Sequence, residues 1–445
     1  FTTNVLGSAS VAIGQNSLNA QNPVSATNMY NVAVGYEAGA AVTTGVENVA
    51  VGAFALDANT TASYNTAVGH GSLSATTTGN QNAAFGYLAL AANTALKNTA
   101  VGAYAHYQST SAQESTAVGY AALAALTTGS YNTAVGALAL DANTTASQNT
   151  AIGYSALGAN TTGYGNTAVG YAALDKNTTA TYNTAIGVFS MDASVSSHDN
   201  TAVGATTLTA MTTGTRNCAF GSSALDNVTT GSYNVGVGVL SGGAVTTGAY
   251  NTCIGDEAGS NLASGASNNT CFGFQARTGS ANSSHAIVIG SNITAASSNN
   301  RFSFGKASNI VHNNFDSNAS WTRTSDERKK KNIKDDVLGL DFINDLRPVT
   351  FEWKPNNEFP EHFKDYKQNN EMTTGVTLHG MIAQDVKSAL DKAGVDTFGG
   401  WEEDSEDGSQ AISQEMFVHP LIKAVQELST QVDELKSELL ALKGI

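Results

Sequence analysis

A short phrase, Asn-Thr-Ala-Val-Gly, recurs along most of this 445-residue chain and limits what the chain can fold into. Its closing glycine returns every 17 residues in all but one interval, where the step is 16. The regular series is Gly35, Gly52, Gly69, Gly86, Gly102, Gly119, Gly136, Gly153, Gly170, Gly187, Gly204, Gly221, Gly238 and Gly255, with less regular copies at Gly14, Gly273, Gly290 and Gly305. A strict short period predicts a β-solenoid of about 18 stacked coils, because each repeat can bury its apolar face only against its neighbours.

Each unit reads as a strand, a glycine, a short apolar stretch and a turn, as in residues 132–145. A unit of 17 residues is too short for a pair of helices, which takes about 30 or more. The residue before the glycine is large and apolar, as in Val34 and Ile152, whereas the one before that is small, as in Ala33 and Ala67. Successive strand side chains point to opposite faces. We therefore expect both faces to be buried, one inside the coil and one against a neighbouring chain, and the pattern leaves open which is which.

The turns of the array are rich in glycine and in Thr-Thr pairs, which supply positive φ angles and side-chain hydrogen bonds. An ice-binding threonine face is the less favoured reading of the same pairs. Stacked coils spaced by about 4.8 Å would form a rod about 85 Å long. The phrase and its period resemble the heads of trimeric autotransporter adhesins, which are left-handed parallel β-rolls that assemble as trimers, and the repeat shafts of phage fibres. The resemblance covers about residues 1–305 and implies a homotrimer.

A change in composition divides the chain near Trp321. Residues 1–320 hold 6 Lys+Arg and 12 Asp+Glu, whereas the remaining 125 residues hold 15 and 24. We therefore predict a repetitive β-solenoid shaft at 1–320 and a second domain at 321–445. In the second domain the pattern predicts helices at 340–346 and 383–393 and a strand at 349–353, so an α+β fold is expected.

Composition also excludes several classes of function. A formal net charge of −15 argues against a nucleic-acid partner, because phosphate binding needs a basic patch. No run of about 18 apolar residues occurs, so no membrane insertion is expected. The first residue, Phe1, begins neither a signal peptide nor a start codon, and we expect the chain to be a fragment or a processed form.

The array shows no pattern of a catalytic or metal site. Its acids are scattered along the sequence, and His70 and His106 read as exposed variants of ordinary repeat residues. Cys253 and Cys271 occupy the same small-residue position one coil apart and read as buried free thiols. We predict no metal and no cofactor.

The second domain opens on Ser-Asp-Glu-Arg-Lys-Lys-Lys-Asn-Ile, residues 325–333. Taken alone, a serine before a lysine run is usually a solvated loop. The stretch resembles the Ser-Asp-x-Arg-x-Lys start of the endosialidase-type intramolecular chaperone, the self-cleaving C-terminal domain of many phage tail fibres and spikes. Residues 379–386 resemble that family's Gly-hydrophobic-Ile-Ala-Gln-Glu-Val segment, with Gln384 matching and Asp385 where Glu is usual. The resemblance covers residues 325–445.

This resemblance implies a Ser-Lys peptidase that cuts its own chain once. Ser325 would be the nucleophile, Lys330 the general base, and Thr324–Ser325 the scissile bond. Asp326 and Arg328 match the motif and support it, with no chemical step assigned. A lysine acts as a base only when uncharged, which burial favours. Because a spacing of five puts the two side chains on one face of neither helix nor strand, a turn or trimer assembly must bring them together.

The last residues carry apolar side chains at alternating spacings of four and three. They are Leu421, Val425, Leu428, Val432, Leu435, Leu439 and Leu442. This heptad seam predicts a coiled coil over residues 420–445. An amphipathic helix that packs on its own domain is the alternative.

Together these features predict a virion tail fibre protein, a mainly β homotrimer used for host attachment. Its C-terminal domain would align three chains, direct their folding and then cut itself off, leaving a mature fibre without catalytic turnover. Expected partners are a host cell-surface receptor, either a polysaccharide or an outer-membrane protein, and other virion tail proteins bound through the missing N-terminal part. The alternatives are a bacterial surface adhesin and a polysaccharide-degrading tailspike with the same chaperone.

Overall fold

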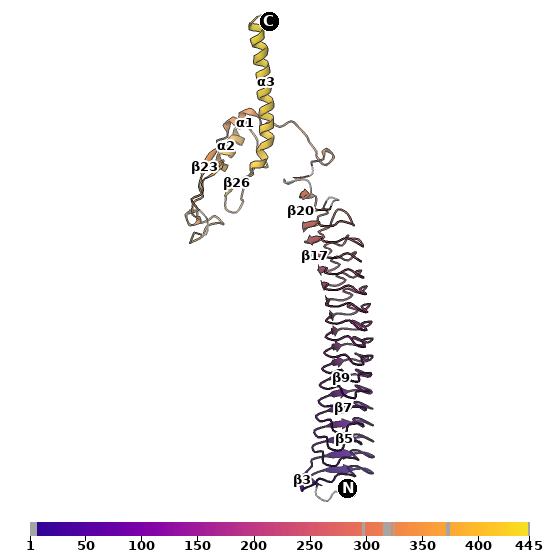
Figure 1. The fold of residues 1–445 in the computed structure, drawn as a ribbon. Coiled ribbons are helices and arrows are strands. Elements are labelled where there is room, and N and C mark those ends of the chain that lie inside the picture. Colours follow the sequence, from indigo (N-terminus) through magenta and orange to yellow (C-terminus); the bar gives the residue numbers. More distant parts are fainter. Residues whose placement is uncertain (1–6, 296–298, 315–321, 324, 371–373, 444–445) are drawn as a thin grey trace. The chain divides into compact units, whose positions relative to one another are not determined.

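The repeats stack into a parallel β-solenoid of about 17 turns, which confirms the predicted mainly β class (Figure 1). Every coil contributes one short strand, and each strand pairs in parallel with the strand of the next coil. Thr133, for instance, lies opposite Thr150, and Val135 lies opposite Ile152. The three-residue strands after β2 (Val11–Ile13) are β4 (Val32–Val34), β5 (Val49–Val51), β6 (Thr66–Val68), β7 (Ala83–Phe85), β8 (Thr99–Val101), β9 (Thr116–Val118), β10 (Thr133–Val135), β11 (Thr150–Ile152), β12 (Thr167–Val169), β13 (Thr184–Ile186), β14 (Thr201–Val203), β15 (Cys218–Phe220), β16 (Val235–Val237), β17 (Thr252–Ile254) and β18 (Thr270–Phe272).

Two longer strands, β19 (Ile287–Ser291) and β20 (Arg301–Lys306), end the parallel stack. β20 then pairs in antiparallel fashion with β21 (Asn309–Asn314), and β21 pairs with β22 (Thr322–Arg323). Near the N-terminus, β1 (Gly7–Ser8) pairs with β3 (Thr27–Asn28) beside the main stack.

This computed structural model describes residues 7–295, 299–314, 322–323, 325–370 and 374–443. The chain divides into two compact units, Phe1–Thr324 and Ser325–Ile445. The first unit holds the solenoid and the second holds the helices.

Within a coil, the two faces of the strand differ sharply in exposure. The small residue at the strand centre points into the coil, and Ala134 is 0% exposed, as is Leu140 four residues after the glycine. The large residue before the glycine points outward, with Val135 36% and Ile152 41% exposed. Within one chain, then, only the small face is buried. The physical reason is the narrow coil: a Cβ built on Gly236 would lie 2.8 Å from Leu225 Cγ, so little space remains for a larger side chain.

A column of buried asparagines ties the coils together. In a representative coil, Asn166 donates from its backbone nitrogen to Asn149 Oδ1 at 2.9 Å and from Nδ2 to Ala180 O at 2.8 Å. The column consists of Asn31, Asn48, Asn65, Asn82, Asn98, Asn132, Asn149, Asn166, Asn183, Asn200, Asn217, Asn234, Asn251 and Asn269, with Ser115 in the place of one asparagine. Because a buried polar group left without a partner is costly, this column favours a single alignment of each coil on the next.

The threonines of the turns have a related role. Thr144 Oγ1 donates to Thr161 O at 3.3 Å, and Thr161 Oγ1 donates to Thr178 O at 3.0 Å. Their hydroxyls are thus used between coils, as the turn reading predicted. Cys253 and Cys271 are buried free thiols, as expected.

His106 differs from its sequence prediction. It is 0% exposed, and neither of its ring nitrogens has a hydrogen-bond partner among the described residues. It occupies the position held by Leu90 and Leu123 in the neighbouring coils, so its side chain enters the apolar column. Burial lowers its pKa from 6.5 to about 4.

We expect the buried His106 to make the shaft less stable in acid. Between pH 6.5 and about 4 the unfolded histidine binds a proton that the folded one does not, so stability falls as pH drops through this window. The loss reaches about 3 kcal/mol near pH 4. Thermal unfolding at pH 7.5 and 4.5 should show a smaller acid shift in His106→Leu than in the wild type. Equal shifts in the two proteins would contradict the assignment.

The second unit is a small α+β domain, as predicted. Its helices are α1 (Leu340–Asp345), α2 (Ala383–Lys392) and α3 (Val418–Leu442), with short 3-10 turns η1 (Glu327–Lys329), η2 (Asn356–Glu358) and η3 (Gln414–Phe417). β23 (Val349–Phe351) pairs with β24 (Leu378–Gly380), and β25 (Trp401–Glu403) pairs with β26 (Gln410–Ile412). The buried core consists of Leu338, Phe342, Val386, Ala389, Leu390 and Phe417.

Helix α3 uses two different faces. Pro420 and Ala424 are buried, and Glu427 accepts a hydrogen bond from Leu340 N at 2.7 Å, which fixes α3 to the start of α1. The heptad side chains remain exposed, from 41% at Val432 to 85% at Leu442. The heptad seam is therefore not the face that packs on the domain.

Candidate functional site

A one-turn helix brings Ser325 and Lys330 together. The 3-10 turn η1 occupies Glu327–Lys329, and it folds the chain back so that Lys330 Nζ donates a hydrogen bond to Ser325 Oγ at 2.7 Å. Residues five apart do not share a face of a regular helix or strand. Across this turn, however, their side chains come into contact. The contact forms within a single chain.

Asp326 holds this turn from its N-terminal end. Its carboxylate accepts hydrogen bonds from Arg328 N at 2.9 Å, Arg328 Nε at 3.0 Å and Arg328 Nη2 at 2.6 Å. The Arg328 side chain and backbone nitrogen lower the pKa of Asp326 below its usual value. Asp326 is thus the N-cap of η1, a position at which aspartate is favoured.

The pair itself is open to solvent. Ser325 and Lys330 are both exposed, as are Lys329 and Lys331 beside them. Burial, which would favour the uncharged amine, is therefore not supplied within one chain. Thr324, the other side of the predicted scissile bond, lies outside the described residues.

The second motif lies at the start of helix α2. Asp385 is in the first turn of α2 and accepts from Arg347 Nε at 3.0 Å and Arg347 Nη2 at 2.7 Å. Gln384 lines a groove of about 600 Å³ with Trp353 and Met381, and residues of β23, β24 and β26 also line it. These residues shape the domain around α2, and their partners differ from those of Ser325 and Lys330.

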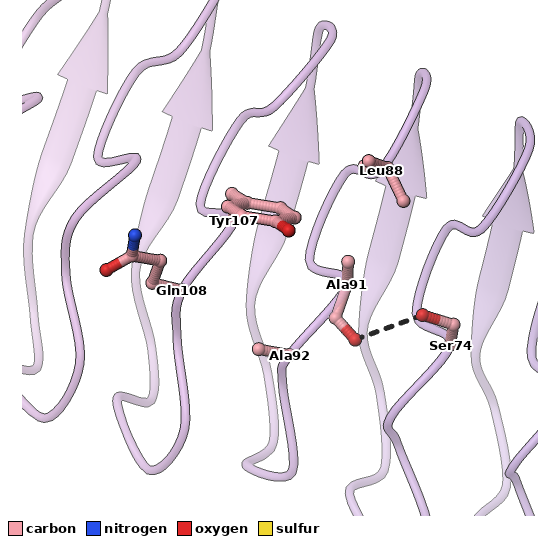
Figure 2. A pocket seen from close by; sticks show the side chains of 6 residues that line it. All are labelled: Ser74, Leu88, Ala91, Ala92, Tyr107 and Gln108. Atoms are coloured by element: carbon pink, nitrogen blue, oxygen red, sulfur yellow. Dashed lines mark hydrogen bonds between the residues drawn. The ribbon is translucent and has the colours of Figure 1, made fainter.

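A shallow hollow on the solenoid is the other candidate (Figure 2). It measures about 400 Å³ and is lined by Ser74, Leu88, Ala91, Ala92, Tyr107 and Gln108. Figure 2 shows that these side chains come from successive coils, and that Ser74 Oγ donates to Ala91 O, at 3.3 Å. None of the six is a carboxylate, histidine, lysine or cysteine, and Tyr107 is the one titratable side chain among them.

Stacking brings some acids of the shaft together that are far apart in sequence. Asp175 and Asp192 occupy the same position of successive coils, and Ser155 Oγ donates to Asp175 Oδ1 at 2.7 Å. Partial burial raises the pKa of Asp192, nearby Asp175 raises it further, and Lys176 opposes both. A spacing of 17 residues conceals such a pair in the sequence. These acids do not line the hollow near Tyr107, and we assign them no catalytic role.

Neither a membrane-spanning helix nor a metal cluster is present among the described residues. Among them, no helix is both long and apolar enough to cross a bilayer. Across the same part of the chain, no three His, Cys, Asp or Glu side chains gather as a metal site would require.

Comparison with known proteins gives a match for one segment of the chain, residues 325–395. Neither the curated proteins nor the solved structures give a match. Among protein families, the model described as chaperone of endosialidase matches residues 325–395. The matched segment begins at Ser325, includes Lys330, Gln384 and Asp385, and ends before α3. From residue 325 to residue 395 the chain is therefore similar to the chaperone of endosialidase, in the place where its sequence motifs lie.

Proposed function

We propose that the chain is a homotrimeric virion fibre of the tail-fibre or tailspike type, whose C-terminal unit acts as an intramolecular chaperone and then cuts the Thr324–Ser325 bond. The observation that carries this proposal is the 2.7 Å contact between Lys330 Nζ and Ser325 Oγ. Ser325 is also the first residue of the second unit. The similarity of residues 325–395 to the chaperone of endosialidase supports the same reading.

In the proposed reaction, the uncharged amine of Lys330 takes the proton of Ser325 Oγ, and this oxygen attacks the carbonyl carbon of Thr324. The C–N bond breaks as the lysine returns the proton to the Ser325 nitrogen, which leaves Thr324 esterified to the Ser325 oxygen. One water then hydrolyses the ester, giving a carboxylate on Thr324 and a free hydroxyl on Ser325. Each chain reacts once, so the mature fibre has no turnover from this site.

The position of the cut suits release of the second unit. Strand β22 (Thr322–Arg323) is paired with β21, with Val311 opposite Arg323. A cut after Thr324 would leave the end of the shaft held by this pairing, while Ser325 and all that follows would form the released piece. No strand pairing of the shaft has to break.

Exposed apolar rows support the homotrimer. Along the shaft, the outward residues before the glycine include Phe85, Val101, Val135, Ile152, Ile186, Phe220, Val237, Phe272 and Ile289, which are 36% to 52% exposed. Beside them runs an aromatic row in which neighbouring ring centroids lie 5.3 Å apart at Tyr36–Phe54 and 6.2 Å apart at Tyr104–Tyr120. Apolar patches of this length on a soluble protein mark contact surfaces, and the free heptad seam of α3 suits association of the same chain.

Assembly would also account for activation and for the use of a chaperone. If trimerisation covers Lys330, burial disfavours its ammonium form, and cleavage then follows assembly. In a shaft this regular, neighbouring chains could pair one coil out of register, and the large apolar residue of each coil would still face the large apolar residue of another. A C-terminal trimeriser would set the register, and its removal would leave a fibre that cannot unfold by the reverse path.

The shaft would then serve host attachment, with a cell-surface polysaccharide or outer-membrane protein as receptor. The alternatives, a bacterial surface adhesin and a polysaccharide-degrading tailspike, would share the chaperone but differ in where the shaft is found and in whether it shortens polysaccharide. Immunogold labelling of purified virions separates the adhesin from the virion proteins.

The test of self-cleavage compares freshly expressed wild-type chain with Ser325→Ala by intact mass under denaturing conditions. We expect two wild-type fragments, one ending at Thr324 and one beginning at Ser325, and a single uncut Ser325→Ala chain. Native mass of the variant should still give a trimer, since alanine removes only the nucleophile. A wild-type chain that stays whole, or a variant that is cut at the same bond, would refute the proposal.

A further inference from the structure

We propose that Asp326 is the positioning residue of the cleavage site: as the cap of the turn η1, it holds Lys330 Nζ against Ser325 Oγ. This inference rests on the proposed self-cleavage and adds a residue to which no role in it has been assigned. It concerns geometry and gives Asp326 no proton to transfer.

The turn between nucleophile and base is short and needs support. Within it, Lys329 N donates to Asp326 O at 3.0 Å and Lys330 N donates to Glu327 O at 2.9 Å. One isolated turn fixes several backbone angles for few hydrogen bonds, so it is unfavourable on its own. The Asp326 carboxylate adds the bond to Arg328 N at 2.9 Å and thereby satisfies a backbone donor that the turn leaves open.

Core packing does not explain Asp326 and Arg328. Their side chains are 32% and 89% exposed, and η1 buries no residue. An ion pair this open contributes little to stability. Replacing Asp326 is therefore expected to destabilise the turn and so to lengthen the distance from Lys330 Nζ to Ser325 Oγ. The effect on the stability of the fold should be small.

Arg328 has a second consequence for the base. A carboxylate close to a lysine favours the ammonium form. Arg328 binds the Asp326 carboxylate at two atoms, Nε and Nη2, so that this charge is satisfied within the turn. The other charged residues close to Lys330 in the sequence are Glu327, Lys329 and Lys331. If Arg328 is removed, the carboxylate is free to pair with these lysines, and the pH dependence of cleavage should move to higher pH.

The experiment follows cleavage of the full chain during cell-free synthesis, with samples quenched in denaturant and measured by intact mass between pH 6 and 9. We expect Asp326→Ala to cut about five- to thirtyfold more slowly than wild type, the range set by loss of a helix cap. Asp326→Asn keeps an oxygen for Arg328 N and should lose much less. Arg328→Ala keeps the cap and should instead shift the pH profile upward. Glu361→Ala, which removes an exposed carboxylate outside η1, is the control and should cut at the wild-type rate.

A second measurement separates positioning from folding. In the Ser325→Ala background, adding Asp326→Ala should leave the yield of trimer by native mass unchanged. Wild-type cleavage with an equally fast Asp326→Ala would overturn the positioning role and leave the proposed function standing. An Asp326→Asn as slow as Asp326→Ala, or a loss of trimer in the double variant, would overturn it as well. A wild-type chain that is never cut would instead refute the proposed function itself.

Discussion

Replacing Lys330 by methionine is expected to slow self-cleavage by about 10²- to 10⁴-fold. The variant keeps most of the side-chain length but removes the nitrogen that contacts Ser325 Oγ at 2.7 Å. A positioned general base contributes about 10²- to 10⁴-fold to rate, so a cut that is half complete within an hour in the wild type should take from about four days to about a year in the variant. Intact mass of the purified chain over time measures this.

Lys330→Arg sharpens the same test. Arginine keeps the positive charge and can donate a hydrogen bond to Ser325, but its guanidinium stays protonated and cannot accept the proton of the hydroxyl. It should therefore be as inactive as methionine. Lys331→Met is the matched control, because Lys331 is the next residue and is also exposed, and it should cut normally. A Lys330→Arg chain that cuts at the wild-type rate would mean that the lysine supplies charge and is not the base.

Placing a side chain on a repeat glycine is expected to damage the shaft most. Gly153 has a φ of +133°, and a Cβ built there would lie 2.3 Å from Gly170 O, in the next coil. Backbone strain of this kind costs about 1–3 kcal/mol, and relief of the overlap costs about 1–3 kcal/mol more. Gly153→Ala should therefore lower the stability of its coil by several kcal/mol, and the effect should centre there because each coil contacts only its neighbours.

Limited proteolysis with mass mapping checks this effect. Gly153→Ala should gain cleavage in the coils around Gly153 and Gly170 and should unfold at a lower temperature. Gly265→Ala is the control, because a Cβ at Gly265 meets nothing within 4 Å. If both variants resist protease like the wild type, the close stacking of glycines does not limit the coil.

Several features of this protein could be predicted from the sequence because they depend on local patterns. The 17-residue period predicted the solenoid, and the heptad spacing predicted a helix near the C-terminus, which is α3 (Val418–Leu442). The helix expected at 383–393 is α2 (Ala383–Lys392). Period, glycine position and amphipathic spacing are properties of neighbouring residues, so they can be recognised without knowledge of the fold.

Other features depended on the width of a coil, the stacking of coils and the path of a turn. The sequence left open which strand face is inside, and the narrow coil places Ala134 inward and Val135 outward. It predicted His106 to be exposed, whereas stacking puts that side chain in line with Leu90 and Leu123. It paired Ser325 with Lys330 only by resemblance, and the turn capped by Asp326 is what brings their side chains into contact. Burial and contact depend on residues that are distant in sequence or on a specific backbone turn, and for that reason only the tertiary structure decided them.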